Sequence, residues 1–131
     1  MRIAVVGMGK IGLPLAVHYA RRGHSVVGVD VNPQTVALIN GGAEPFPGEA
    51  HLAEYLPPLA SSGALRATTN YAEAIPGADA VVMVVPLVVD AESRPDFTIM
   101  DAATHSMAAH LSPGTLVSYE TTLPVGTTRG R

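Results

Sequence analysis

The sequence predicts an α/β fold built on a parallel sheet, and two observations carry that prediction. Apolar, β-branched runs that suit buried strands alternate with segments of helical periodicity along the 131 residues. The run Ala80–Val85 is apolar throughout, which is typical of a strand covered on both faces. The composition agrees, since only 15% of the residues are charged and about a quarter is usual. The length fits one domain or part of a larger one.

The order of the elements follows from local signals. The expected strands are Arg2–Val6, Ser25–Asp30, Leu65–Thr68, Ala80–Val85 and Leu116–Tyr119. The expected helices are Ile11–Arg22, Pro33–Asn40, Glu49–Ser61, Tyr71–Ile75 and Phe97–Leu111. Right-handed crossovers then give the doubly wound, Rossmann-type order 3-2-1-4-5. Such sheets usually have six strands, so we expect the chain to stop before the sixth.

Each helix has a recognisable beginning or end. The first places Leu15, Ala16, Tyr19 and Ala20, with Ile11, at helical spacing, and Gly23 ends it. The second starts at an Asn32 cap followed by Pro33, and Gly41 and Gly42 stop it. We expect the third to break near Pro57 and Pro58. In the last, Met100, Ala103, Met107 and Ala108 are expected to face inward, and a loop is expected before it over Val88–Asp96.

A G-x-G-x-x-G turn, Gly7–Gly12, joins the first strand to the first helix. Gly7 permits the tight turn, Gly9 lets the backbone approach a pyrophosphate, and Gly12 lets the helix pack closely on the strand. The amides of Met8 and Ile11 and the free N–H groups of the helix start can donate to the phosphates. A lysine at the position of Lys10 more often has a solvated side chain than one that binds phosphate. This strand–turn–helix context predicts a dinucleotide site.

Asp30 ends the second strand, 18 residues after Gly12. At that position a carboxylate can accept a hydrogen bond from a ribose 2′-OH. The residues that follow, Val31 and Asn32, offer no arginine for a 2′-phosphate, so the sequence favours NAD over NADP. The alternative interpretation is that Asp30 is a solvated acidic residue in the turn before a helix and binds no ligand.

The composition argues against several other classes. No cysteine is present, so this chain has no disulfide, thiolate metal site or cysteine nucleophile. The net charge of −3 gives no support for binding to nucleic acid or to a membrane surface. No segment is long and apolar enough to span a bilayer, and the glycine-broken start is unlike a secretory signal, so we expect a cytoplasmic location. The five histidines show no ligand spacing, and no metal is expected.

Several segments together resemble the nucleotide-sugar dehydrogenases, such as those acting on UDP-glucose, GDP-mannose and UDP-N-acetylmannosamine. They are Gly7–Ala16 with its Leu-Pro-Leu-Ala continuation, Gly28–Asn32, Leu38–Gly41 and, most specifically, Glu120–Thr128. The last resembles the family's Glu-Ser/Thr-Thr-Val-Pro-Pro-Gly-Thr-Thr. One departure is Val85-Pro86-Leu87-Val88, where the family often has Val-Pro-Thr-Pro, so Leu87 lacks the threonine hydroxyl.

The resemblance implies a four-electron oxidation in which a sugar C6 alcohol becomes a carboxylate and two NAD are reduced. The family's thiol nucleophile, catalytic lysine, central helix and nucleotide-sugar-binding domain lie beyond the matching segments. Residues 1–131 are therefore expected to be the NAD-binding part of a longer enzyme that takes a UDP-sugar and forms a homodimer or higher oligomer. The resemblance also gives Thr121 a contact on the nicotinamide side and makes Thr122 the hydroxyl that orders the catalytic water and the reacting oxygen.

The remaining candidates lie after the fourth and fifth strands, at the sheet edge where ligands bind. Pro86 and Leu87 are candidate backbone contacts to the cofactor, or simply a packed loop. Glu120, Thr121 and Thr122 are candidates on the same edge, or a capping turn in which hydroxyls bond nearby backbone. Two other functions stay open: a 3-hydroxyacid or 6-phosphogluconate-type dehydrogenase, and a non-catalytic nucleotide-binding module.

Overall fold

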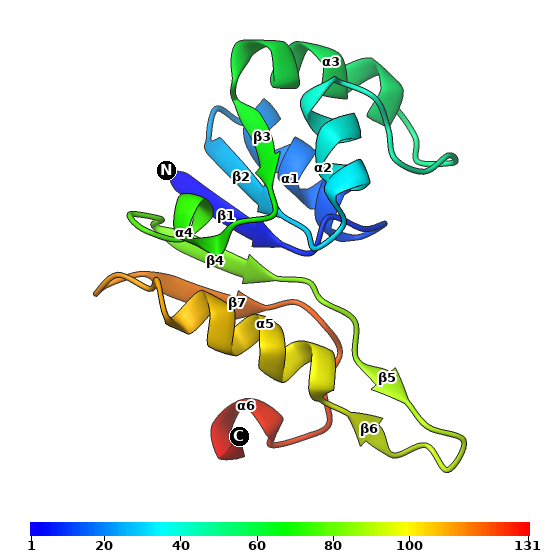
Figure 1. Ribbon diagram of the computed structural model, residues 1–131, viewed down its shortest axis with the longest axis vertical. Coiled ribbons are helices and arrows are strands. Elements are labelled where there is room, and N and C mark those ends of the chain that lie inside the picture. Colours follow the sequence, from blue (N-terminus) through cyan, green and yellow to red (C-terminus); the bar gives the residue numbers. More distant parts are fainter.

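A computed structural model describes all residues from Met1 to Arg131. Its centre is a five-stranded parallel sheet in the order β3-β2-β1-β4-β7. Figure 1 shows the strands in this order from the upper part of the view downward. The strands are β1 (Arg2–Val6), β2 (Ser25–Val29), β3 (Leu65–Thr68), β4 (Ala80–Met83) and β7 (Leu116–Tyr119). The predicted topology is confirmed.

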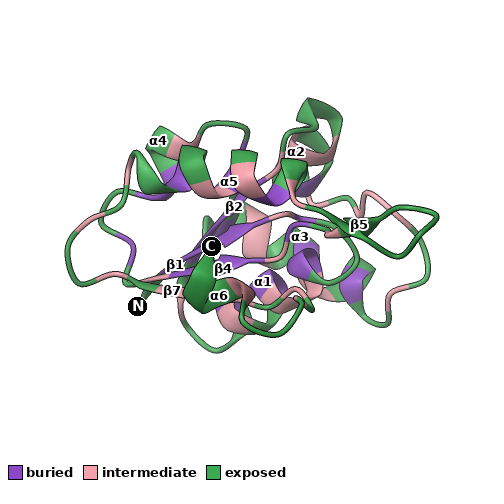
Figure 2. Ribbon diagram, turned by 90° about the horizontal axis from the view of Figure 1, so that it is seen from below, coloured by how far each residue is buried: buried purple, intermediate pink, exposed green.

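Helices cover both faces of this sheet. They are α1 (Gly12–Arg21), α2 (Pro33–Asn40), α3 (Leu52–Ser62), α4 (Tyr71–Ala74), α5 (Thr98–Ala108) and α6 (Thr127–Gly130). One core cluster joins β1 and β2 to α1, α2 and α3, and a second joins the other face to α4 and α5. Figure 2 shows α4 and α5 on one side of the strands and α1 and α3 on the other. The chirality rule for crossovers produces this division, since the chain winds outward to β3 and then returns to β4.

Two predictions of secondary structure were wrong. Helix α3 runs through Pro57 and Pro58 without a break; the prolines are exposed, while Leu52 and Leu56 on the same helix are buried and hold it against the core. Residues 88–96 contain a short hairpin, β5 (Val88–Val89) with β6 (Pro95–Asp96), where a loop was expected.

The hairpin is closed by one side chain. The Asp90 carboxylate accepts hydrogen bonds from the backbone of Glu92 and Arg94 and from the Arg94 guanidinium, at 2.8–3.0 Å. Figure 1 shows this hairpin projecting from the rest of the molecule. A turn organised by a side chain has little hydrophobic periodicity, which explains why the sequence pattern missed it.

The predicted helix cap and the predicted inward-facing residues are mostly confirmed, with two exceptions. The Asn32 cap is confirmed, because its side chain accepts from the Gln34 N–H at 2.9 Å. Ile11 was expected within the first helix, at the spacing of its apolar residues, but it is 63% exposed, because it lies in the turn before α1 begins. Ala108 is likewise exposed, while Met100, Ala103 and Met107 are buried as expected. No helix has both the length and the apolar character needed to cross a bilayer.

Candidate cofactor-binding site

A cleft of about 490 Å³ opens between α4 and α5, above the carboxyl ends of β1, β2 and β4. In a doubly wound sheet, the crossovers leave β1 and β4 in opposite directions, which opens a crevice at their carboxyl ends. Four of the sequence-predicted site residues line this cleft: Gly7, Asp30, Val31 and Pro86. Most of the other lining side chains are apolar, as suits a flat, largely apolar ligand group.

The glycine-rich turn has the geometry that its spacing predicted. Gly7 has a φ of 96°, and a Cβ there would stand 2.9 Å from the Val84 carbonyl oxygen. At Gly12 a Cβ would stand 2.8 Å from the Gly7 carbonyl carbon, so the helix can approach the strand only without a side chain. Beside Gly9 there is open space for at least 4 Å. These three surroundings fit a turn whose backbone a pyrophosphate can approach.

Met8 is engaged within the protein, although its amide was expected to donate to the phosphates. Its side chain is fully buried, and it lies where a Cβ on Gly28 would come 2.8 Å from Met8 Cγ. The Met8 N–H, a predicted donor to phosphate, donates instead to Asp30 Oδ2 at 3.0 Å. Gly9, Lys10 and Ile11 are the exposed residues of the turn.

Asp30 is held from two sides at the mouth of the cleft. Its Oδ2 accepts from Met8, and its Oδ1 accepts from the Asn32 N–H at 2.9 Å. Each oxygen keeps a further lone pair, so the oriented carboxylate can still accept from a ribose hydroxyl. None of the side chains lining the cleft is lysine, arginine or histidine. This electrostatic environment favours a hydroxyl over a phosphate beside Asp30.

The candidates after β4 and β7 are brought to the same sheet edge but do not line the cleft, apart from Pro86. Thr121 Oγ1 donates to the Val85 carbonyl at 2.6 Å and ties the two strand ends together. The Glu120 N–H donates to the Met83 carbonyl at 3.0 Å, and its carboxylate accepts from Ser118. Thr122 is exposed, and Leu87 packs partly buried against the core.

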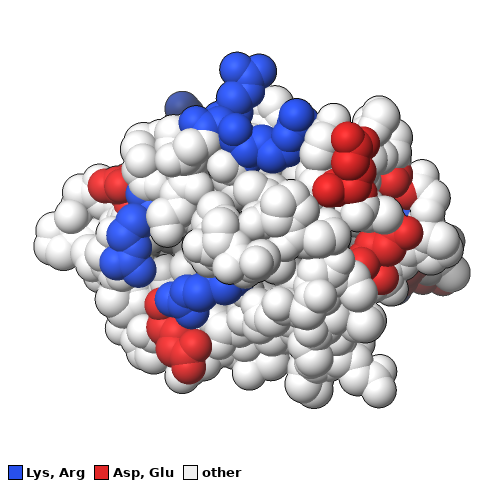
Figure 3. All heavy atoms as spheres, turned by 90° about the horizontal axis from the view of Figure 1, so that it is seen from above, with Lys and Arg blue, Asp and Glu red and all other residues white.

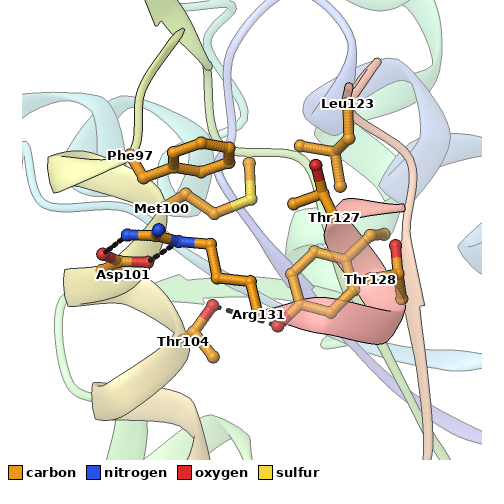
Figure 4. A pocket seen from close by; sticks show the side chains of 9 residues that line it. Phe97, Met100, Asp101, Thr104, Leu123, Thr127, Thr128 and Arg131 are labelled. Atoms are coloured by element: carbon orange, nitrogen blue, oxygen red, sulfur yellow. Dashed lines mark hydrogen bonds and ion pairs between the residues drawn. The ribbon is translucent and has the colours of Figure 1, made fainter. Parts of the chain in front are cut away.

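The chain just after these threonines borders a second, smaller hollow of about 110 Å³ between α5 and α6. Figure 4 shows the Arg131 side chain spanning it toward Asp101, with the Phe97 ring nearby. The guanidinium carbon lies 4.2 Å from the centre of that ring. Asp101 and Arg131 therefore anchor α6, and with it the end of the Glu120–Thr128 segment, to α5.

Sequence reasoning missed the wall of the large cleft. Tyr71 lines it from α4, and Thr98, Ile99 and Ser106 line it from α5. Burial is the main cause that raises the pKa of the Tyr71 phenol, and the negative charge of Asp30 raises it further. Tyr71 comes shortly after the carboxyl end of the third strand, separated from it by a short loop. That position could have identified it from the sequence as a residue at the ligand-binding edge of the sheet.

The face of the molecule that is seen from above in Figure 1 carries few charged groups. Figure 3 shows one face on which small groups of basic and acidic side chains stand apart on a mostly uncharged surface. No three histidine, aspartate or glutamate side chains come together in a way that could hold a metal ion.

Comparison with known proteins identifies the family. Residues 1–130 match the UDP-glucose/GDP-mannose dehydrogenase family, NAD binding domain. The UDP-N-acetyl-D-mannosamine dehydrogenase of Escherichia coli K12 is 40% identical over 126 residues, which cover 96% of this chain and 29% of that protein. The chain thus spans less than a third of the length of this relative.

Solved structures agree. A GDP-mannose dehydrogenase from Pseudomonas aeruginosa superposes with a TM-score of 0.91 at 26% identity, covering 99% of this chain and 30% of the other. A UDP-N-acetyl-mannosamine dehydrogenase from Staphylococcus aureus gives 0.89 at 29% identity, covering 99% and 31%. The cofactor of the matched domain is NAD, and the chain belongs to the UDP-glucose/GDP-mannose dehydrogenase family.

Proposed function

We propose that residues 1–131 are the NAD-binding part of a longer enzyme that oxidises the C6 alcohol of a UDP-sugar to a carboxylate with two NAD. The observation that carries the proposal is the cleft beside the glycine-rich turn, with Asp30 oriented at its mouth by two backbone N–H groups. The relatives named as UDP-N-acetylmannosamine dehydrogenases favour a UDP-sugar.

Different residues of this chain bind different parts of the cofactor in this proposal. Asp30 accepts from the adenosine ribose, with Val31 beside it, and the backbone of Gly9, Lys10 and Ile11 receives the pyrophosphate. Gly7, Met8 and Gly12 shape that turn from below, because other backbone lies close to both glycines and the N–H and side chain of Met8 are engaged within the protein. When bound, NAD supplies the hydride acceptor.

The segments that follow β4 and β7 contact the nicotinamide side of the cofactor in this proposal. Pro86 and Leu87 offer backbone contacts there, and Glu120 and Thr121 hold the two strand ends in register. Thr122 is the residue we propose to touch the reacting groups, since it is exposed at this edge. The sugar-binding domain, the thiol nucleophile and the oligomer interface would come from other parts of the longer, cytoplasmic enzyme.

The alternatives from the sequence receive less support. The family match distinguishes this chain from 3-hydroxyacid and 6-phosphogluconate-type dehydrogenases. A non-catalytic nucleotide-binding module would need only the cleft, and a measurement of activity in the longer enzyme separates it from the proposal.

Calorimetric titration with NAD and with NADP tests the cofactor part. We expect weak NAD binding and weaker NADP binding, and Asp30→Ser should reduce the preference by roughly tenfold, because a hydrogen bond to a charged group is worth ~1.5–3 kcal/mol. Equal or tighter binding of NADP by the unaltered chain would show that the role given to Asp30 is wrong.

Steady-state kinetics tests the catalytic part. The present chain alone should oxidise no UDP-sugar. In the longer enzyme, Thr122→Ala should lower turnover by about 10²-fold, within the range for positioned acid–base groups, with a smaller effect on NAD affinity. Unchanged turnover would make Thr122 an ordinary loop residue.

A further inference from the structure

The adenosine end of the large cleft contains one ring that none of the assigned roles uses. Tyr71 is the first residue of α4 and lines the same cleft as Asp30. Its ring packs, partly buried, against the core cluster on the α4–α5 face of the sheet. We propose that Tyr71 is a second specificity-determining residue, whose ring occupies the space beside Asp30 that a 2′-phosphate would need. This inference rests on the proposed role of Asp30.

The backbone that carries Tyr71 is fixed by hydrogen bonds. Asn70 caps α4, with its side chain accepting from the Ala72 N–H at 2.9 Å. The Asn70 N–H donates to Thr68 Oγ1 at 3.0 Å, and Thr68 in turn donates to Glu73 at 2.9 Å. The start of α4 is therefore anchored to the end of β3, and the ring projects from a rigid base. A wall that does not move can exclude a larger group.

The charges around the ring point to the same role. Burial, and after it the Asp30 charge, raises the pKa of the phenol, so Tyr71 is neutral at physiological pH. A neutral ring adds no charge of its own, and its partly buried place in the wall of the cleft that Asp30 also lines leaves less room for water there. Because a carboxylate is screened less where water is excluded, Asp30 repels a nearby phosphate more strongly. No lysine, arginine or histidine lines the cleft to offset that repulsion.

The main test compares two substitutions by titration with NAD and NADP. Tyr71→Leu keeps an apolar group against the core but removes the outer part of the ring. We expect it to reduce the ratio of NAD to NADP affinity by about fivefold, an effect of the size measured for partly exposed charge interactions. Tyr71→Phe keeps the ring and should leave the ratio within about twofold of the original. Circular dichroism before titration confirms that each variant is folded.

Several results would overturn the inference. If Tyr71→Leu weakens NAD and NADP equally, the ring is a general wall and does not discriminate between them. If the ratio does not change in Tyr71→Leu but falls in Asp30→Ser, the inference fails while the proposed function stands. If the unaltered chain binds neither nucleotide, the proposed function itself has failed.

An alkaline absorbance titration provides an independent readout. The chain has four tyrosines, and the difference from the Tyr71→Phe variant isolates the signal of Tyr71. In an Asp30→Asn variant Tyr71 should ionise at a lower pH, because the negative charge that helps to raise its pKa is gone. An unchanged ionisation would show that Tyr71 is not close enough to Asp30 to shape its surroundings.

Discussion

The two edge strands of the sheet differ in how their outer backbone groups are hydrogen-bonded and covered. At the β3 edge, the Asn40 side chain from α2 donates to the Ala67 carbonyl and accepts from its N–H, at 2.9 and 2.8 Å. An amide side chain thus takes the place of a neighbouring strand. At the β7 edge, the strand pairs only with β4, and none of its four residues is fully buried.

The difference affects the two halves of the site. Asp30 lies on β2's carboxyl end, inside a part of the sheet that is covered on both faces and protected at its edge. Glu120, Thr121 and Thr122 follow an edge strand whose first residue, Leu116, is 66% exposed. An unprotected apolar edge is a surface that proteins usually cover. The half of the site that we propose for adenosine is therefore supported by this chain's own packing to a greater degree than the half that we propose for nicotinamide.

The largest expected effect compares one leucine from each edge strand. Leu65 begins β3 and is 1% exposed, whereas Leu116 begins β7. Leu65→Ala should lower the free energy of unfolding by about 2–5 kcal/mol, because it leaves a cavity in the core. Leu116→Ala should change it by less than about 0.5 kcal/mol. Urea denaturation measures both, and similar losses would mean that the two edges are equally packed.

The amide at the β3 edge should have the next largest effect. Asn40→Ala removes both partners of Ala67 and should cost about 1–3 kcal/mol, because a buried backbone donor and acceptor lose their hydrogen bonds. Amide hydrogen exchange should show faster exchange at Ala67, while exchange in β4 stays unchanged. Asn32→Ala is the control, since it removes only the exposed cap of the same helix. Unaltered exchange at Ala67 would mean that Asn40 does not protect the edge.

Two adjacent threonines refine the comparison on the β7 side. Thr121→Val removes the hydrogen bond to the Val85 carbonyl and should cost about 1 kcal/mol. Thr122→Val, at the exposed neighbour, should change the free energy of unfolding by less than about 0.5 kcal/mol. Thermal denaturation of both variants decides the point. Equal effects would contradict the division into a structural Thr121 and a free Thr122.

The smallest expected effect is a pH dependence of α6 docking. The hydrogen bond from Arg131 is the main cause that lowers the pKa of Asp101 from its ordinary value of 3.8. A lowered pKa stabilises the fold above the ordinary value, and that contribution is lost as the pH falls through the lowered pKa. Asp101→Asn should therefore flatten the acid limb of the stability curve slightly. The pair is exposed, so added salt should shrink the difference; an unaltered acid limb would show that Asp101 makes no contribution.

The sequence by itself determined the parts that depend on local chemistry. Alternating strands and helices gave the sheet order, since handed crossovers allow few alternatives. The spacing of Gly7, Gly9 and Gly12 with Asp30 predicted the turn beside the cleft, because Gly7 and Gly12 each meet a local steric need and Gly9 leaves its side of the turn open. The Asn32 cap and the buried run of β4 were equally local. The family resemblance followed from the same segments and from Glu120–Thr128.

Only the tertiary structure decided what depends on contacts between distant residues. Met8 donates to Asp30 across 22 positions, Asn40 protects β3 across 27, and Arg131 reaches Asp101 across 30. Packing also overruled the helix-breaking tendency of Pro57 and Pro58, and it placed Tyr71 in the wall of the cleft. No periodicity records such pairings, because they arise from the way separate elements meet at the sheet.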